Sequence, residues 1–419
     1  GGSSAGVGWQ APSVLSFPDP TDFPPLPRAL WQAPKPSLAA PPKPFLPAPS
    51  KPSLPAPQAG FVPVPFQAPR WQGAPAATQP FKKLSPWDRG EAYRAGCLDK
   101  RVGLHLEILD FVAYIKPTIA EGRRRENLVD VTRQITAKLW PGSELKVYGS
   151  YSTGLWLPSS DVDLVVVKCD AHPVQALHRL KKELAKFSNF GNILVIGSAK
   201  VPIIKWNDLH SGIELSVCVE MADGVANSKW VAEQAQAFPP LEPLLLVLKQ
   251  FLYNRDLNDT SSGGVGSTLL TMTVISLLQS RKQGADYEKA ESNLGVLLMD
   301  YLDMMGLFEN ERDGISVRDG GLIFDKRTRG WHKSGRPFLL ACEDPLNPNK
   351  DMGCNSYKVQ DVQRAMREAW GCLSAPTMPG WTPLGSILQW FGRQDMAFIT
   401  QRTRTFAERQ GLGTQSHLR

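Results

Sequence analysis

Proline is distributed so unevenly along this 419-residue chain that it separates a part that can fold from a part that cannot. Of the 36 prolines, twenty-one lie between Pro12 and Pro80, in runs such as PPKPFLPAPSKPSLPAP. Each proline fixes its own φ and removes a backbone donor, so this stretch can form neither helix nor sheet. We therefore expect residues 1–84 to be a disordered, proline-rich tail. Its aromatic side chains favour a linker, with contact points for a partner as the alternative.

The remaining composition narrows the class of protein. The 42% hydrophobic content is enough for one large or two medium domains, and no apolar run approaches the roughly 18 residues of a membrane-spanning helix. About five of the seven net positive charges lie in the tail, so the basicity fits an anionic partner and simple solubility about equally well. The six cysteines are scattered and predict reduced thiols, with neither a disulfide framework nor a zinc site.

Hydrophobic periodicity divides the rest of the chain into two regions. Up to about residue 225, helical spacing at 103–115, 126–140 and 173–187 alternates with short apolar runs typical of strands. The expected strands lie in ELKVYGS, DVDLVVV, NILVIGS, VPIIKWN and GIELSVCVE. After residue 225 the pattern is helical. We therefore expect a mixed α/β lobe followed by an α-rich lobe, with a cleft between them.

The stretch GSYSTGLWLPSSDVDLVV, residues 149–166, carries the residues best suited to chemistry. Asp161 and Asp163 are two apart on a predicted strand, so both carboxylates point to the same side. Divalent cations such as Mg²⁺ would relieve their repulsion and share phosphate oxygens with a substrate. Upstream, Gly149, Ser150 and Ser152 lie at a strand-to-helix turn, which suits an anion. The combination predicts nucleotidyl transfer.

VYGSYSTGLWLPSSDVDLVV also resembles the catalytic signature of non-canonical poly(A) polymerases, in particular the Trf4/5-like branch of the DNA polymerase β-like nucleotidyltransferase superfamily. Other motifs of that branch follow in the same order, among them VPIIK, LLLVLKQFLYNRDLND, SSGGVGS and CEDPLNPNKDMGCNSY. The resemblance covers roughly residues 86–372. It implies an α+β fold, with a polymerase β-like nucleotidyltransferase lobe of mixed sheet and helices and an α-rich poly(A) polymerase-type central domain.

The resemblance also implies domain boundaries. Residues 85–124 would form the N-terminal part of the central helical domain and residues 125–235 the nucleotidyltransferase, or palm, domain. The rest of the central domain, with its nucleotide-recognition motif, would occupy 236–375. We expect residues 376–419 to be a poorly ordered extension.

Carried over residue by residue, the resemblance implies three metal-binding catalytic positions: Asp161, Asp163 and Glu214. It implies phosphate or nucleotide contacts from a second set of residues: Gly149, Ser150, Ser152, Asn227, Lys249, Ser267, Thr268, Asn347 and Lys350. Lys249 also interrupts the apolar run LLLVLKQFLY, where a lysine is costly unless it meets an anion or extends its amine to solvent. The residues alone leave those two alternatives open.

The chain departs from the family pattern at both ends of this expected site. Glu214 replaces an aspartate; its extra methylene moves the carboxylate by about 1.5 Å, and a misplacement of about 1 Å can cost on the order of a hundredfold in rate. We expect an active, slower enzyme. Thr268 replaces a tyrosine that stacks on the base, Lys350 an asparagine and Cys354 an arginine. Because lysine only donates hydrogen bonds, Lys350 suits uracil O4 or guanine O6 better than the adenine amino group.

These observations favour a template-independent RNA 3′-terminal nucleotidyltransferase, a polynucleotide adenylyltransferase that adds AMP from ATP with two Mg²⁺ or Mn²⁺ ions. A terminal uridylyl or mixed-nucleotide transferase is one alternative, and a catalytically impaired scaffold of the same fold is another. A general nucleic-acid-binding protein is disfavoured, because no RNA-binding module is recognisable. The resemblance further implies RNA 3′ ends as substrate, zinc-knuckle and helicase partners, and the nucleus, with the cytoplasm as the alternative location.

Overall fold

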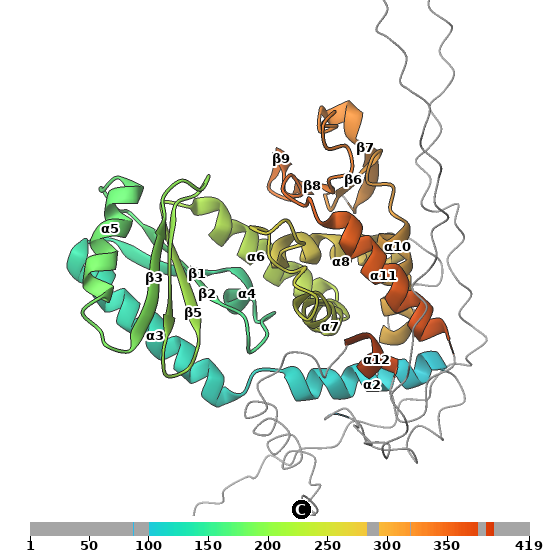
Figure 1. The fold of residues 1–419 in the computed structure, drawn as a ribbon, viewed down its shortest axis with the longest axis horizontal. Helices are drawn as coiled ribbons and strands as arrows, with labels where there is room; N and C mark the ends of the chain where they lie inside the picture. The colour runs from blue at the N-terminus through green and yellow to red at the C-terminus, as the bar shows by residue number, and fades with distance from the viewer. Residues whose placement is uncertain (1–86, 88–99, 283–292, 319, 376–382, 389–419) are drawn as a thin grey trace, which may run out of the picture.

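The computed structural model describes Trp87 and residues 100–282, 293–318, 320–375 and 383–388, and the element labels are those of Figure 1. The expected tail, residues 1–84, lies outside the described residues. Two lobes lie side by side (Figure 1). We call them the sheet lobe, from α3 to β5, and the helical lobe, which contains α2 and the elements from α6 onward. Each has its own hydrophobic core.

The sheet lobe is built on five strands in the order β1-β2-β5-β4-β3. β2 pairs antiparallel with β1 and parallel with β5, which makes the sheet mixed as predicted. Helices α3 and α5 pack against it, and the helical lobe lies on the other side (Figure 1). The strands are β1 (Glu144–Tyr148), β2 (Val162–Val167), β3 (Phe190–Ile196), β4 (Ile203–Asp208) and β5 (Glu214–Val219).

β2 occupies the centre of this core, as its nearly continuous apolar sequence predicts. Val162, Leu164, Val165 and Val166 are all fully buried. The helices of the lobe are α3 (Ile119–Leu139), the one-turn α4 (Gly149–Thr153) and the amphipathic α5 (Pro173–Leu184).

The chain passes from one lobe to the other at a proline. α2 (Lys100–Ile115) packs on α7, α10 and α12 in the helical lobe. Pro117 stops it, because proline lacks the donor that would continue the helix. Thr118 then caps α3: its side chain accepts a hydrogen bond from Glu121 N, and the Glu121 carboxylate accepts one from Thr118 N. The helical lobe therefore contains chain from before and after the sheet lobe.

Long apolar helical runs form the core of the helical lobe. In α7 the ten residues from Leu244 to Tyr253 include nine that are buried, one of which is Lys249. The helices are α6 (Ala222–Ala237), α7 (Leu241–Tyr253), α8 (Ser267–Lys282), α10 (Leu294–Leu307) and α11 (Val359–Ser374).

The α-rich lobe also contains a second sheet, in the order β7-β6-β8-β9, which the helical pattern after residue 225 does not predict. Its strands have four or five residues, too few to show an alternating pattern, and the β9 sequence NPNKD contains no aliphatic or aromatic residue. Pairing with neighbouring strands stabilises these short segments as strands, although their own sequences do not predict it. The elements are β6 (Asp313–Ser316), β7 (Leu322–Asp325), the 3₁₀ helix η3 (Lys326–Arg329), β8 (Ala341–Asp344) and β9 (Asn347–Asp351).

Part of the expected C-terminal extension is packed rather than poorly ordered. α12 (Pro383–Leu388) buries Leu384 and Leu388 in the helical core, and the Leu384 backbone N–H donates to Glu107 Oε2 at 2.7 Å. The indole N–H of Trp87 donates to the same carboxylate. The five cysteines among the described residues are free thiols, and no helix among those residues has the length and hydropathy to cross a membrane.

Candidate active site

A glycine turn is pressed against an acidic side chain at the end of β1. The strand runs directly into α4, as the sequence predicts, and Gly149 has a left-handed φ of 70°. A Cβ at this position would lie 2.5 Å from Asp163 Oδ2, so only glycine fits. The Gly149 N–H donates to Ser228 Oγ of α6 at 2.7 Å. This contact joins the turn to the helical lobe.

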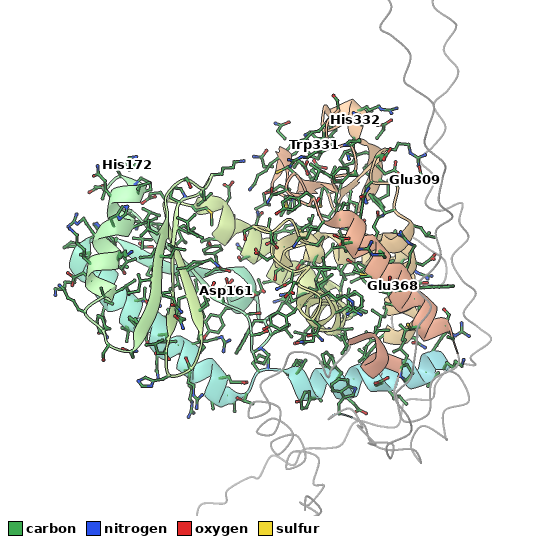
Figure 2. The ribbon with its side chains drawn as sticks, in the orientation of Figure 1. Asp161, His172, Glu309, Trp331, His332 and Glu368 are labelled. Atoms are coloured by element: carbon green, nitrogen blue, oxygen red, sulfur yellow. The ribbon has the colours of Figure 1, made fainter. Side chains whose placement is uncertain are left out.

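Asp161 and Asp163 lie at the start of β2, and Figure 2 places Asp161 between the sheet and the helical lobe. Burial, with the nearby charge of Asp161, raises the pKa of Asp163 to about 7. Burial also raises the pKa of Asp161. Ser216 Oγ donates to Asp163 Oδ1 at 2.7 Å and opposes this trend. The pair offers oxygen ligands that Mg²⁺ and Mn²⁺ prefer, and a cation bound there would offset the repulsion. The pair therefore fits a divalent metal.

Glu214 is held differently from that pair. It begins β5 with half of its side chain exposed, and Lys205 Nζ donates to its Oε1 at 2.6 Å. The same amine lies 3.9 Å from Asp161 Oδ2. Burial is the largest influence on the Lys205 pKa and lowers it, but the bond to Glu214 and the charges of Glu214, Asp161 and Asp163 together outweigh burial, so the net pKa is raised. Among the described residues, no three acidic, histidine or cysteine side chains are grouped to hold a metal ion.

Glu220 does not replace Glu214. It lies beyond the far end of β5, and its Oε1 accepts a hydrogen bond from Cys169 N at 2.6 Å.

Lys249 does not reach solvent. It is 6% exposed, and its Nζ donates to the Leu155 carbonyl across the lobe boundary. Burial lowers its pKa to about 8, although the charges of Asp161 and Asp163 act in the opposite direction. A buried amine is suited to a phosphate, because the negative charge of the phosphate would favour the protonated form that burial disfavours.

A cavity of about 400 Å³ opens between the lobes and gathers most of the predicted residues. Eight of them line it: Gly149, Ser150, Asp163, Asn227, Lys249, Ser267, Thr268 and Lys350. Four do not. Asp161 and Glu214 lie beside it on the sheet, and Ser152 Oγ donates to the Gly149 carbonyl. The Asn347 side chain accepts from Asn349 N at the exposed start of β9.

Sequence reasoning missed two kinds of residue in this region. Tyr148 and Thr153 flank the predicted turn and were within reach of the motif. The others come from segments that only the fold brings together: Leu155, Lys200, Val201, Met221, Asp223, Gly224, Ser228, Val231, Thr271 and Met352 line the cavity, and Lys205 and Ser216 contact its acids.

Charges at the other end of the cavity are already paired. Lys350 Nζ lies 2.9 Å from Asp344 Oδ2 and 3.4 Å from Asp223 Oδ2. Burial raises the pKa of Asp344, but hydrogen bonds from Lys350, Leu346 N and Asn227 outweigh burial and lower it. Asn227 donates through Nδ2 to Asp344 at 3.2 Å, while its buried Oδ1 has no partner among the described residues. That oxygen can accept a hydrogen bond from a ligand.

Two known families match this chain. Residues 104–233 match the family described as poly(A) RNA polymerase, mitochondrial-like, central palm domain, and residues 293–350 match the Cid1 family poly A polymerase.

Individual proteins agree with the family matches. The chain is 35% identical to the poly(A) RNA polymerase CID14 of Cryptococcus neoformans, over 66% of this chain and 37% of that protein. It is 34% identical to the inactive non-canonical poly(A) RNA polymerase protein Trf4-2 of Drosophila melanogaster, over 69% and 72%. The solved polymerase core of TRAMP, an RNA surveillance complex, matches with a TM-score of 0.63 and 30% identity, over 73% of this chain and 99% of that one. The chain spans less than half the length of the first curated relatives it matches.

Proposed function

The chain belongs to the non-canonical poly(A) RNA polymerases of the DNA polymerase β-like nucleotidyltransferase superfamily, and on this premise we propose that it adds AMP from ATP to RNA 3′ ends without a template. One observation carries the proposal. A single cavity between the lobes brings together the Gly149 turn, the Asp163 carboxylate and the buried Lys249 amine. These are the groups that a triphosphate and its cations require.

Each group has a distinct task in this proposal. Lys249 binds the triphosphate, and Ser267, at the first position of α8, contacts its terminal phosphate. Gly149 allows that phosphate to approach the backbone. Asp161 and Asp163 hold Mg²⁺ or Mn²⁺; bound cations favour ionisation of the attacking 3′ hydroxyl and offset charge on the leaving pyrophosphate. Ser216 fixes the orientation of Asp163.

Base selection is assigned to the opposite end of the cavity. Asn227 Oδ1 is the buried acceptor available there, and Thr268 and Lys350 also line this space. A uridylyl or mixed-nucleotide transferase is the alternative that Lys350 favours, because its amine donates to an acceptor such as uracil O4. The pairing of Lys350 with Asp344 weakens that preference.

A catalytically impaired scaffold is the second candidate. Glu214 is bonded to Lys205 rather than turned to the acidic pair, and a relative with 34% identity is named inactive. We also propose nuclear RNA 3′ ends as substrates, and zinc-knuckle and helicase partners, supported by the likeness to the polymerase core of an RNA surveillance complex.

Primer extension tests the proposal directly. The full chain is incubated with an RNA primer, Mg²⁺ and each of the four ribonucleotides, beside Asp161→Ala/Asp163→Ala and the exposed control Asp130→Ala. We expect extension that is most efficient with ATP, lost in the double variant and kept in the control. Extension by the double variant contradicts the active-site assignment. If UTP is used as well as ATP or better, the uridylyl or mixed-nucleotide alternative replaces the proposal. If the wild type extends nothing and Glu214→Asp does extend the primer, the chain is the catalytically impaired scaffold.

A further inference from the structure

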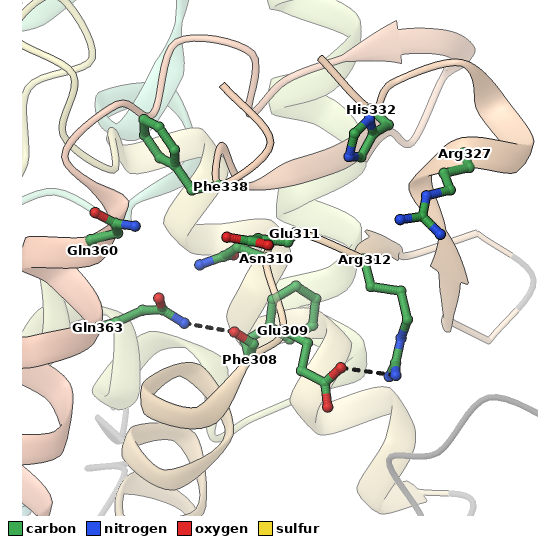
Figure 3. Close-up of a pocket in the computed structure, with 10 residues that line it drawn as sticks. All are labelled: Phe308, Glu309, Asn310, Glu311, Arg312, Arg327, His332, Phe338, Gln360 and Gln363. Atoms are coloured by element: carbon green, nitrogen blue, oxygen red, sulfur yellow. Dashed lines mark hydrogen bonds and ion pairs between the residues drawn. The ribbon is translucent and has the colours of Figure 1, made fainter. Parts of the chain in front are cut away.

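A second cavity, of about 480 Å³, lies in the helical lobe. None of its described lining residues is shared with the catalytic cavity. Figure 2 shows Glu309 and His332, two of these residues, well away from Asp161. The walls come from the loop after α10, from η3 and the segment that follows it, and from the first turns of α11: Phe308, Glu309, Asn310, Glu311, Arg312, Arg327, His332, Phe338, Gln360 and Gln363 (Figure 3).

The side chain of Asn310 is the least expected feature of this cavity. It is only 5% exposed, yet neither its Oδ1 nor its Nδ2 has a hydrogen-bond partner among the described residues. Buried polar atoms are hydrogen-bonded in the great majority of cases, because an unpaired one retains its full desolvation cost. Asn310 lies on the cavity wall across from Gln363 (Figure 3). Both atoms have almost no accessible surface, so the side chain must turn toward the cavity to bond a ligand there.

The backbone around Asn310 is fixed before any ligand arrives. Buried Lys326 donates to the Asn310 carbonyl at 2.5 Å, to the Pro337 carbonyl at 2.8 Å and to the Leu339 carbonyl at 2.7 Å. Gln363 Nε2 donates to the Phe308 carbonyl at 2.7 Å from the facing helix. These contacts join the walls of the cavity to one another. The backbone that carries Asn310 is therefore held in place, which lowers the entropic cost of binding.

The lining is neutral and partly aromatic. Phe308 and Phe338 contribute rings, and Gln360 contributes a further amide at the exposed edge of α11. The two arginines and two glutamates balance in charge, and Arg312 already pairs with Glu309 at 2.8 Å. Such a lining does not suit a polyanionic backbone, which needs an excess of positive charge. Arg327 makes no ion pair within the described part of the chain and can bind one phosphate group.

We propose that this cavity is a second, non-catalytic nucleotide-binding site, in which the Asn310 amide bonds the edge of a nucleobase and the phenylalanine rings contact its face. A primary amide presents a donor beside an acceptor, and so do the hydrogen-bonding edges of nucleobases. Aromatic rings supply the stacking that bases use in proteins. An extended peptide also has donors and acceptors, but it spaces them along a strand, whereas the unpaired donor and acceptor of this cavity lie on one amide. The nucleotide comes either from free solution or from an RNA strand.

Calorimetric titration of the full chain with adenosine 5′-monophosphate tests the proposal. Asn310→Ala should weaken binding about tenfold or more, because two hydrogen bonds are lost. Lys249→Met, in the catalytic cavity, should leave this binding unchanged. The thermal midpoint of Asn310→Ala should equal or exceed that of the wild type, since an unpaired buried amide is removed; a structural role for Asn310 would lower it. Binding that is lost in Lys249→Met but kept in Asn310→Ala overturns the proposal.

A second pair of variants keeps the test decisive if Asn310→Ala fails to fold. Gln360→Trp places a ring over the cavity edge and should abolish binding, while Gln134→Ala, an exposed helical glutamine on α3, should not change it. Titration with a five-nucleotide oligoadenylate separates the two sources. Equal affinity for monomer and oligomer assigns free nucleotide, and Asn310-dependent binding of the oligomer alone assigns RNA. If neither binds at millimolar concentration, the proposal is wrong.

Discussion

The two ends of the catalytic cavity carry charge in opposite ways. At the phosphate end, burial raises the pKa of Asp163 and lowers that of Lys249, so each charged form is disfavoured by its surroundings. At the base end, burial also disfavours the charged forms of Asp344 and Lys350, but their hydrogen bond, mutual attraction and other partners together outweigh it, lowering the pKa of Asp344 and raising that of Lys350. The first end gains from a charged ligand, whereas the second is already neutralised. We infer that the phosphate end binds the substrate through its charge, and that the base end selects the substrate by its shape.

Lys249→Met should give the largest effect, because it removes the buried amine from the phosphate end. We expect kcat/KM for the nucleotide to fall by about a hundredfold, the scale of one charge-assisted bond to phosphate. The thermal midpoint should not fall, because methionine fills the same space without a buried amine. Steady-state primer extension and thermal unfolding measure the two quantities. A large loss of stability with little loss of kcat/KM would assign Lys249 to packing.

The pH dependence of metal stabilisation should sharpen the same contrast. Because the folded-state pKa of Asp163, about 7, exceeds the unfolded value of 3.8, the metal-free folded protein binds more protons between these limits. Its stability therefore falls as pH rises through that window. Mg²⁺ competes with those protons, so it should stabilise little at pH 5 and by on the order of 2 kcal/mol above pH 7. Thermal unfolding with and without Mg²⁺ measures this difference.

The matched control for that experiment is Asp161→Ala/Asp163→Ala. It removes both carboxylates and should remove the Mg²⁺-dependent part of the stability at every pH. Equal stabilisation of the wild type at pH 5 and pH 8 would mean that the cation binds elsewhere.

How much the sequence predicts also differs between the two lobes. The Gly149 turn and the Asp161/Asp163 pair are local features, because a two-residue repeat on a strand and a glycine at a turn constrain their own geometry. The mixed sheet and most helices likewise follow from periodicity. The pairing of Lys205 with Glu214 does not, because it depends on the register of β4 against β5.

The second sheet escapes sequence analysis for a related reason. β6 and β8 pair in parallel, although some twenty-five residues separate them, and each has only four residues. Asn310 carries no sequence signal either, since its unpaired amide becomes apparent only after Lys326 and α11 close around it.

Lys350→Asn tests the base end of the catalytic cavity, and its effect should be smaller than that of Lys249→Met. The variant restores the asparagine that the family pattern predicts and leaves buried Asp344 with Asn227 and Leu346 N as partners. We expect the ratio of kcat/KM for ATP to that for UTP to rise by less than tenfold, and the stability to fall by about 1 kcal/mol. Lys200→Asn, at another lysine that lines the cavity, is the control. An unchanged ratio would remove Lys350 from base selection.

Lys205→Met should have the smallest effect, and its direction decides what Lys205 does. Lys205 Nζ lies 2.6 Å from Glu214 and 3.9 Å from Asp161, so it partly neutralises the acids that a divalent cation would use. If it competes with the cation, its removal should lower the Mg²⁺ concentration for half-maximal activity by about threefold, the scale of one partly exposed charge interaction. Combined with Glu214→Asp, the change should be larger, because the released carboxylate can turn toward the pair. A higher Mg²⁺ requirement in Lys205→Met would instead assign Lys205 to binding the substrate. The phosphate end would then hold two lysines that bind the substrate, Lys205 and Lys249.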